Sequence, residues 1–195
     1  MGWRLATFAI VLAAEAFLLA ALLYSIRRPR RRIWPPPAQR SWQFLTVWIA
    51  TAAAFLGSVA LAFLDYGSFV FDHVAWRWIG GVLIVTGTAL ADWGVRTLTS
   101  RTSRGLGGMF RWRGPYRWTR NPQYLGHAAV VLGVMLAFDS TLVIVTGLLG
   151  IACLILTPVA EEPWLAERYG EEYQEYLREV PRFLGRPGPG GGSAR

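Results

Sequence analysis

Two short segments of the 195-residue chain carry most of the side chains that could bind a polar ligand. The first segment, GPYRWTRNPQYLG at residues 114–126, combines two prolines, two arginines and two tyrosines with an asparagine and a glutamine. The second segment places the carboxylates of Glu161 and Glu162 directly after a long apolar stretch. Carboxylates accept hydrogen bonds from amines and hydroxyls, and the free N–H groups at a helix start attract anions. Together the two segments predict a site for a polar ligand that carries amines and hydroxyls.

Five apolar stretches must position these two segments. The chain is 53% hydrophobic and only 16% charged, and a helix crosses a bilayer with about 20 mostly apolar residues. We therefore expect five transmembrane helices, at about residues 5–26, 42–64, 78–95, 123–138 and 141–159. The last two would form a hairpin that turns at Asp139 and Ser140, or alternatively a buried pair of shorter helices. Because the helices of a hairpin are antiparallel, segment 114–126 and the glutamate pair should meet at one membrane surface.

The rest of the chain adds an amphipathic helix and a tail to an all-α, polytopic membrane fold. Apolar residues recur at helical spacing through residues 161–180, namely Leu165, Tyr169, Tyr173, Tyr176 and Val180. This periodicity predicts a helix that lies at the inner membrane surface and ends at Pro181. We expect residues 1–184 to form a single domain, and the Gly- and Pro-rich residues 185–195 to form a disordered tail.

The basic residues, all of which are arginine, predict the orientation in the membrane. The connections at 27–40 and 96–123 carry six and seven arginines, whereas the connection at 65–77 carries one. Arginine-rich loops stay in the cytoplasm, so we expect the N-terminus outside and the C-terminus in the cytoplasm. Arginine in place of lysine, with abundant alanine and glycine, is typical of a GC-rich prokaryotic genome. The predicted location is therefore the inner (plasma) membrane, crossed several times.

The sequence argues against several other functions. The net charge of +8 is concentrated on one side of the membrane, so the bilayer rather than nucleic acid is the expected partner. His73 and His127 are far apart and have no neighbours at metal-ligand spacing, which predicts no metal site. Cys153 stands alone, which excludes an intramolecular disulfide. Glu15 interrupts the first apolar stretch, where a charge is costly. This predicts a functional role, a protonated carboxyl, or a polar partner from another helix or subunit.

The two polar segments resemble the motifs of a known superfamily, the isoprenylcysteine carboxyl methyltransferases and phospholipid methyltransferases. In this chain the first motif reads GPYRWTRNPQYLG, and the second, from residue 161, reads EEPWLAERYGEEYQEYLREVPR. The specific match covers residues 114–126 and 161–183, about a fifth of the chain. Members of the superfamily are integral-membrane enzymes that use S-adenosylmethionine (SAM). The resemblance therefore implies a SAM-dependent methyltransferase.

The resemblance also implies which residues contact the cofactor. By position in the motifs these are Gly108, Met109, Phe110, Arg111, Tyr116, Arg120, Asn121, Pro122, Gln123, Tyr124 and Glu161. The side-chain chemistry agrees with this assignment, because Glu161 can accept from ribose hydroxyls or from the methionine amine. The ring of Tyr116 or Tyr124 can face the sulfonium cation, a contact worth roughly 0.5–2 kcal/mol. The prolines would fix the backbone so that these groups stay in place.

Two residues depart from the superfamily pattern. Asn121 stands where the family usually has His, and an amide cannot take a charge near neutral pH. Thr157 stands where the isoprenylcysteine enzymes have an Arg that orients a substrate carboxylate. Thr157 and Glu162 are the residues expected to face the substrate, although Glu162 could instead be an exposed charge at a helix start. The sequence identifies no catalytic base, and His127 is expected to be a packing residue.

We therefore expect methyl transfer from SAM to a lipophilic acceptor at the cytoplasmic membrane surface, by in-line displacement. The missing Arg favours a neutral, amine, thiol or phenol nucleophile over a carboxylate. One alternative is an NADPH-dependent reductase of the sterol-reductase type, whose C-terminal part has similar motifs. Another is a non-catalytic relative that binds a lipid or a partner protein.

Overall fold

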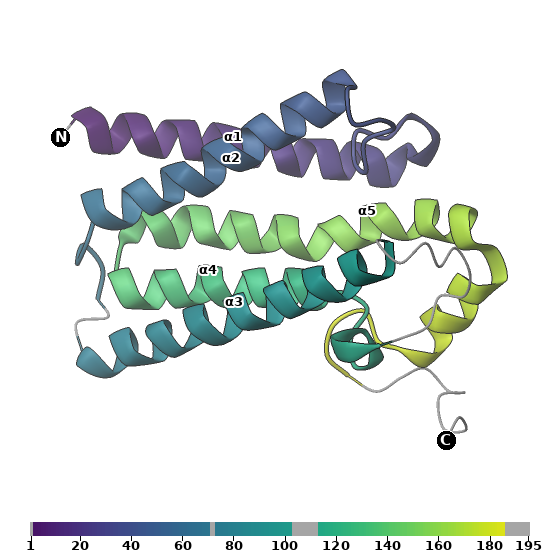
Figure 1. Ribbon diagram of the computed structural model, residues 1–195. Coiled ribbons are helices and arrows are strands. Elements are labelled where there is room, and N and C mark those ends of the chain that lie inside the picture. The colour runs from purple at the N-terminus through teal and green to yellow at the C-terminus, as the bar shows by residue number, and fades with distance from the viewer. Residues whose placement is uncertain (1, 71–72, 103–112, 186–195) are drawn as a thin grey trace.

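The computed structural model describes residues 2–70, 73–102 and 113–185, and every regular element in these ranges is a helix. Figure 1 shows the arrangement of the α-helices. In chain order they are α1 (Gly2–Arg27), α2 (Trp42–Leu64), α3 (Val74–Thr102), α4 (Pro122–Phe138) and α5 (Thr141–Glu179). Two short 3-10 helices lie in the connections, η1 (Pro29–Arg31) and η2 (Gly114–Arg117). The structure confirms the all-α fold.

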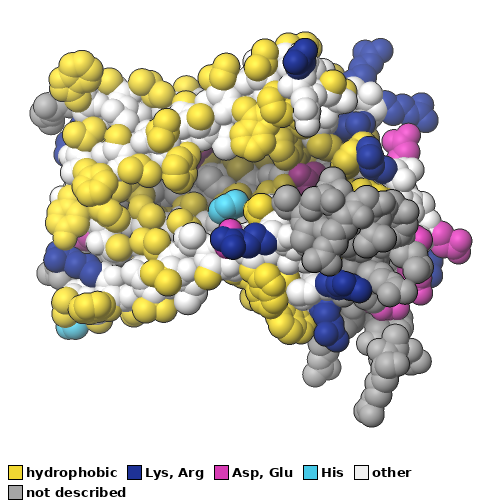
Figure 2. Space-filling model, viewed as in Figure 1, with side chains coloured by type: hydrophobic (Ala, Val, Ile, Leu, Met, Phe, Trp, Pro, Cys, Tyr) yellow, Lys and Arg dark blue, Asp and Glu magenta, His cyan; other side chains and the backbone are white. Residues whose placement is uncertain are grey.

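The helices have the length and hydropathy of membrane spans. α1, α2, α3 and α5 are each long and apolar enough to cross a bilayer, and α4 is a shorter apolar helix of 17 residues. Figure 2 shows hydrophobic side chains along the length of the bundle, whereas charged side chains gather toward one end. This is the surface of a polytopic membrane protein. α5 has 39 residues, far more than a bilayer needs, so we take its apolar part, residues 141–159, as the crossing segment.

The end of α5 differs from the sequence-based prediction. We expected a transmembrane helix to end at residue 159 and a separate amphipathic helix to begin at 161, but α5 continues through Pro158 and Pro163. A proline removes one backbone hydrogen bond and bends a helix without necessarily ending it. The actual break is at Gly170, whose φ of 58° lies in the left-handed region that glycine adopts at low cost. The other spans agree with the expected ones to within a few residues, except that α3 is longer at both ends.

The bundle consists of two helix pairs, one on each side of α5. α1 packs with α2, α3 packs with α4, and α5 contacts both α1 and α4 (Figure 1). The predicted hairpin turn between α4 and α5 is present, with Asp139 in a left-handed conformation and Ser140 as the N-cap of α5. The predicted tail falls almost entirely beyond residue 185, outside the described residues.

Glycines allow α3 and α4 to pack at very short distance. Gly80, Gly87 and Gly94 are seven residues apart on α3, and Gly126 and Gly133 are seven apart on α4. A Cβ atom at Gly80 would lie 2.6 Å from the backbone oxygen of Gly133, and one at Gly87 would lie 2.6 Å from that of Gly126. These distances leave no room for a side chain. The contact fixes α4, and therefore the segment just before it, against α3.

One end of the bundle is held by Asp65, which follows α2. Its Oδ1 accepts from Arg4 at 3.1 Å, and its Oδ2 accepts from the hydroxyls of Ser68 and Ser140 and from the backbone N–H of Leu142. Burial would raise the pKa of Asp65, but these hydrogen bonds and the charge of Arg4 lower it below its usual value. The carboxylate therefore ties the ends of α1, α2 and α5 together.

The buried carboxyl of Glu15 faces α5 in the middle of the bundle. The residue is 5% exposed, and its Oε2 has no hydrogen-bond partner among the described residues. A Cβ atom at Gly150 would lie 3.3 Å from its Oε1, so α1 and α5 are close at this point. The polar partner that the sequence led us to expect is not found in the described part of the chain.

Candidate active site

At the end of the bundle opposite Asp65, which we call the arginine-rich end, three segments meet at one carboxylate. Glu161 lies on α5 just past the crossing segment, and its Oε1 accepts from the hydroxyl of Tyr124 at 2.6 Å and from the indole N–H of Trp34 at 2.9 Å. Tyr124 belongs to α4 and Trp34 to the connection between α1 and α2. Both hydrogen bonds end on Oε1, and Oε2 has none within the described ranges. Burial raises the pKa of Glu161, although the two hydrogen bonds oppose this effect.

The sequence analysis missed Trp34, which the end of α1 holds in place. The hydroxyl of Ser25, which is 1% exposed, accepts from the backbone N–H groups of Ile33 and Trp34, each at 3.0 Å. The Trp34 ring packs against a buried cluster that includes Leu22 and Ala160. The motif comparison contained no signal for Trp34, because it concerned only the two segments after residue 113. The sequence nevertheless contained one sign that Trp34 has a specific contact. It is a large aromatic residue directly before three prolines, in a connector too polar to cross a membrane.

Tyr116 contributes a second aromatic side chain, and its position is set by η2. Gly114 opens η2 with a φ of 58°, and Pro115 is buried. The Tyr116 hydroxyl accepts from the side-chain amide of Gln123 at 3.1 Å. Burial raises the pKa of Tyr116 to about 12; the charge of Glu161 adds to this rise, and the bond from Gln123 opposes it. Tyr116 is therefore a neutral phenol at any physiological pH.

Arg120, a predicted cofactor contact, binds the protein's own C-terminal segment instead. Its Nη1 donates to the backbone oxygens of Leu177 and Val180 at 2.9 and 2.8 Å, and its Nη2 donates to Glu162 at 2.8 Å. Its backbone N–H donates to the oxygen of Pro181. The side chain is 10% exposed. These contacts hold the chain after α5 against the start of α4.

Glu162 belongs to the same set of contacts. Arg182 donates to both of its carboxylate oxygens, at 2.9 and 2.6 Å, and Arg120 donates to one of them. The interpretation of Glu162 as an exposed charge at a helix start is therefore wrong, because the side chain is 16% exposed and lies within α5. Burial would raise the pKa of Glu162, but the hydrogen bond from Arg182 and the charges of both arginines lower it.

Asn121 also contacts the C-terminal segment. Its side-chain amide donates to the backbone oxygen of Arg182 at 2.9 Å, and the hydroxyl of Thr119 donates to the same oxygen at 3.1 Å. Pro122 follows as the first residue of α4 and is buried. We call Arg120, Asn121, Glu162 and Arg182 together the C-terminal clamp. This contact needs a side-chain N–H donor, and the Asn121 amide provides one without a titratable ring.

The remaining predicted residues do not join these contacts. Thr157 donates to the backbone oxygen of Cys153, one turn earlier in α5, at 2.7 Å. His127 is exposed on α4, so the expectation that it packs in the interior is wrong. Residues 108–111, from Gly108 to Arg111, lie outside the described residues. The structure thus gathers Tyr116, Gln123, Tyr124 and Glu161 at one place, whereas Arg120 and Asn121 contact the backbone of residues 177–182.

Comparison with known proteins adds one finding. A sequence model of the phospholipid methyltransferase family matches residues 75–172, half of the chain. The matched stretch runs from α3 to the last part of α5 and contains segment 114–126 and both glutamates. The phospholipid methyltransferase family is part of the superfamily that the two motifs predict. No curated protein and no solved structure matches the chain.

Proposed function

Because the chain belongs to the phospholipid methyltransferase family, we propose that it transfers a methyl group from SAM to a lipophilic acceptor at the arginine-rich end. One observation carries the assignment of the site. The Glu161 carboxylate is held by Tyr124 and Trp34 through a single oxygen. Its other oxygen has no hydrogen-bond partner among the described residues and can accept from a ligand. The family match favours this function over the reductase alternative.

The side chains around Glu161 suit the groups of SAM. The open Oε2 can accept from the amine or from ribose hydroxyls, and the rings of Tyr116 and Tyr124 offer faces to a cation. The backbone N–H groups at the start of α4 suit a carboxylate. When bound, SAM supplies an electrophilic methyl group on a positively charged sulfur. Residues 108–111 would complete the site, as the sequence motif implies.

The C-terminal clamp has a positioning role in this proposal. Arg120 and Asn121 donate to the backbone of residues 177–182, and the hydroxyl of Tyr176 donates to the backbone oxygen of Tyr116 at 3.0 Å. The last part of α5 is therefore attached to η2, which carries Tyr116. We infer that Arg120 and Asn121 shape the cofactor site without contacting the cofactor. This revises the direct contact that the motif implied.

The acceptor is proposed to be neutral or an amine. A carboxylate acceptor needs a cation near it, and Thr157 offers none where related enzymes have Arg. In the reaction the acceptor's lone pair forms a bond to the methyl carbon while the bond between carbon and sulfur breaks, which leaves S-adenosylhomocysteine. Positioning supplies most of the acceleration of such a displacement. No general base is required when the acceptor arrives with a free lone pair.

Methyl-labelled SAM provides the direct test. We would incubate the detergent-purified full chain with labelled SAM and a total bacterial lipid extract, and then count label in the organic phase. The proposal predicts label that depends on the wild-type protein and falls at least tenfold in Glu161→Ala. Glu175→Ala, which removes an exposed glutamate from the same helix, should retain activity. Equal label with and without protein would refute transfer to any lipid in that extract.

A further inference from the structure

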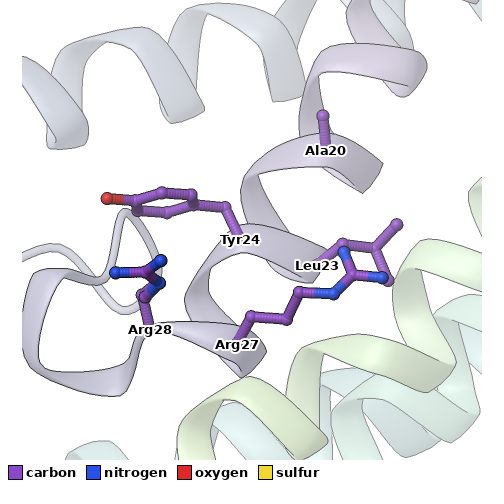
Figure 3. A pocket seen from close by; sticks show the side chains of 5 residues that line it. All are labelled: Ala20, Leu23, Tyr24, Arg27 and Arg28. Carbon is purple, nitrogen blue, oxygen red and sulfur yellow. The ribbon is translucent and has the colours of Figure 1, made fainter.

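A groove on the arginine-rich half of α1 lies apart from the candidate active site. Its lining residues are Ala20, Leu23, Tyr24, Arg27 and Arg28, and its volume is about 450 Å³. Figure 3 shows Leu23 beside Arg27 on one side and Tyr24 beside Arg28 on the other, with Ala20 one turn earlier. Each side is thus a pair of residues one helical turn apart. The small side chain of Ala20 leaves the space between the two pairs open.

The groove is on a different face of α1 from the one that supports Glu161. Leu22 and Ser25 are buried, and they contact α5 and the backbone of Trp34. Tyr24 and Arg27, in contrast, are exposed. A molecule in the groove therefore does not reach Glu161, so the groove is not where the methyl acceptor reacts.

The two guanidinium groups of the groove have no acceptor among the residues that the structure describes. Within the described part of the chain, neither Arg27 nor Arg28 makes a side-chain hydrogen bond or an ion pair. None of the five described residues that line the groove is acidic. Four other arginines of the described chain, in contrast, are paired with carboxylates, namely Arg4, Arg96, Arg120 and Arg182. Two exposed positive charges, one on each side of the groove, indicate a site for an anion.

The apolar part of the groove identifies the kind of anion. Ala20 and Leu23 lie inside the apolar span of α1, whereas Arg27 is its last residue. The groove therefore runs from the level of the acyl chains to the level of the headgroups. A soluble anion would leave Ala20 and Leu23 uncovered. A phospholipid matches both parts, because its phosphate and its acyl chain have the same order along the membrane normal.

We propose that this groove binds one anionic phospholipid of the membrane leaflet that faces the arginine-rich end. The phosphate lies between the guanidinium groups of Arg27 and Arg28 and accepts from the hydroxyl of Tyr24. The start of one acyl chain lies along Leu23 and Ala20. The planar donors of arginine match phosphate oxygens, and clustered arginines beside a span attract anionic lipids. The site does not depend on the methyl-transfer activity proposed above.

Native mass spectrometry of the detergent-purified full chain tests the proposal. With added phosphatidylglycerol we expect one retained lipid per chain, and with phosphatidylcholine much less. The double substitution Arg27→Gln/Arg28→Gln should weaken retention of phosphatidylglycerol by about tenfold or more. The control Arg30→Gln/Arg31→Gln removes the same charge from η1, outside the groove, and should change retention by less than about twofold.

A second variant tests the groove without altering charge. Ala20→Phe places a large side chain between the two pairs on an exposed helix face, and it should reduce retention as strongly as the double substitution. Equal losses of phosphatidylglycerol retention in Arg27→Gln/Arg28→Gln and in Arg30→Gln/Arg31→Gln would overturn the proposal in favour of general electrostatic attraction. Full retention in Ala20→Phe would show that the lipid does not lie in the groove, which contradicts the proposal. Displacement of phosphatidylglycerol by millimolar inorganic phosphate would show that the acyl chain contributes nothing, which also contradicts the proposal.

Discussion

At the scale of single residues, two neighbouring carboxylates have different roles. Glu161 receives two hydrogen bonds on one oxygen and none on the other within the described residues, whereas both oxygens of Glu162 are bound by arginines. Adjacent positions on a helix point about 100° apart, which explains how one residue faces Tyr124 and the next faces Arg182. The sequence motif cannot show this difference, because both residues are glutamate. Residue type alone does not tell a ligand contact from a member of the clamp.

Removal of the Glu162 charge should therefore affect stability. In Glu162→Gln the ion pairs with Arg120 and Arg182 are lost and Arg120 stays largely buried. We expect a loss of about 1–3 kcal/mol in the free energy of unfolding. Glu175→Gln, on an exposed position of the same helix, should change it by less than about 0.5 kcal/mol. Thermal unfolding in detergent would measure both, and equal values for the two variants would contradict the clamp.

At the scale of elements, the glycine contact between α3 and α4 sets the position of the site. Because Pro122 and Gln123 begin α4, any separation of α4 from α3 moves Gln123 and with it the contact to Tyr116. The seven-residue spacing of the glycines is visible in the sequence and could have predicted the contact. Hydropathy, which predicts the membrane spans, does not distinguish these glycines from the other small residues of the same stretches.

Two adjacent glycines of α3 provide a matched test of that contact. A Cβ at Gly80 would meet backbone atoms of α4 at 2.6 and 2.7 Å, whereas a Cβ at Gly81 would meet nothing within 4 Å. We expect Gly80→Ala to destabilise the fold by about 1–3 kcal/mol. Gly81→Ala should stabilise it by about 0.5–1 kcal/mol, because alanine favours a helix. A comparison of melting temperatures decides the matter, and similar shifts for both variants would refute the close packing.

The Asp65 contacts at the opposite end predict a pH dependence. Its pKa is lowered in the folded state, so its contribution to stability is complete above its unfolded value of about 4. That contribution is lost as the pH falls through the folded pKa. The melting temperature should therefore fall below pH 4, and Asp65→Asn should be less stable at pH 7 but lose less on acidification. Identical pH profiles for both proteins would exclude this role.

Most of the helices and the turn between α4 and α5 could be predicted from the sequence, but the contacts of the C-terminal clamp could not. Apolar length located the helices, and the Asp139–Ser140 turn followed from the only polar break between two apolar runs. The clamp depends on backbone oxygens of residues 177–182. Backbone groups are the same at every position, so no residue type marks which of them Arg120 will bind. The position of the break inside α5 was missed for a similar reason: it lies at Gly170 rather than at the nearby prolines, and the φ of Gly170 depends on the tertiary fold.

At the scale of the whole molecule, the charge distribution predicts the orientation. The structure gathers the arginine-rich connection of 28–41, η2 and the last part of α5 at one end of the bundle (Figure 1). We propose that this end faces the cytoplasm, where SAM is available. The candidate active site and the lipid groove would then both lie at the inner surface of the membrane.

Thiol labelling in intact cells checks this orientation. In a Cys153→Ala background, a cysteine at Val70 would lie at the opposite end and one at Gln39 at the arginine-rich end; both positions are exposed. A membrane-impermeant maleimide should label Val70→Cys in intact cells and Gln39→Cys only after lysis. The reverse pattern would show that the arginine-rich end is outside.

The most direct test of the central claim is calorimetric titration of S-adenosylhomocysteine into the detergent-purified chain. The claim is that the carboxylate of Glu161, held by Tyr124 and Trp34, binds the cofactor. It predicts micromolar binding to the wild-type protein that is lost in Glu161→Ala, weakened about tenfold in Tyr124→Phe, and retained in Glu175→Ala. Binding of equal strength in wild type and Glu161→Ala, or no binding to folded wild-type protein, would contradict the account.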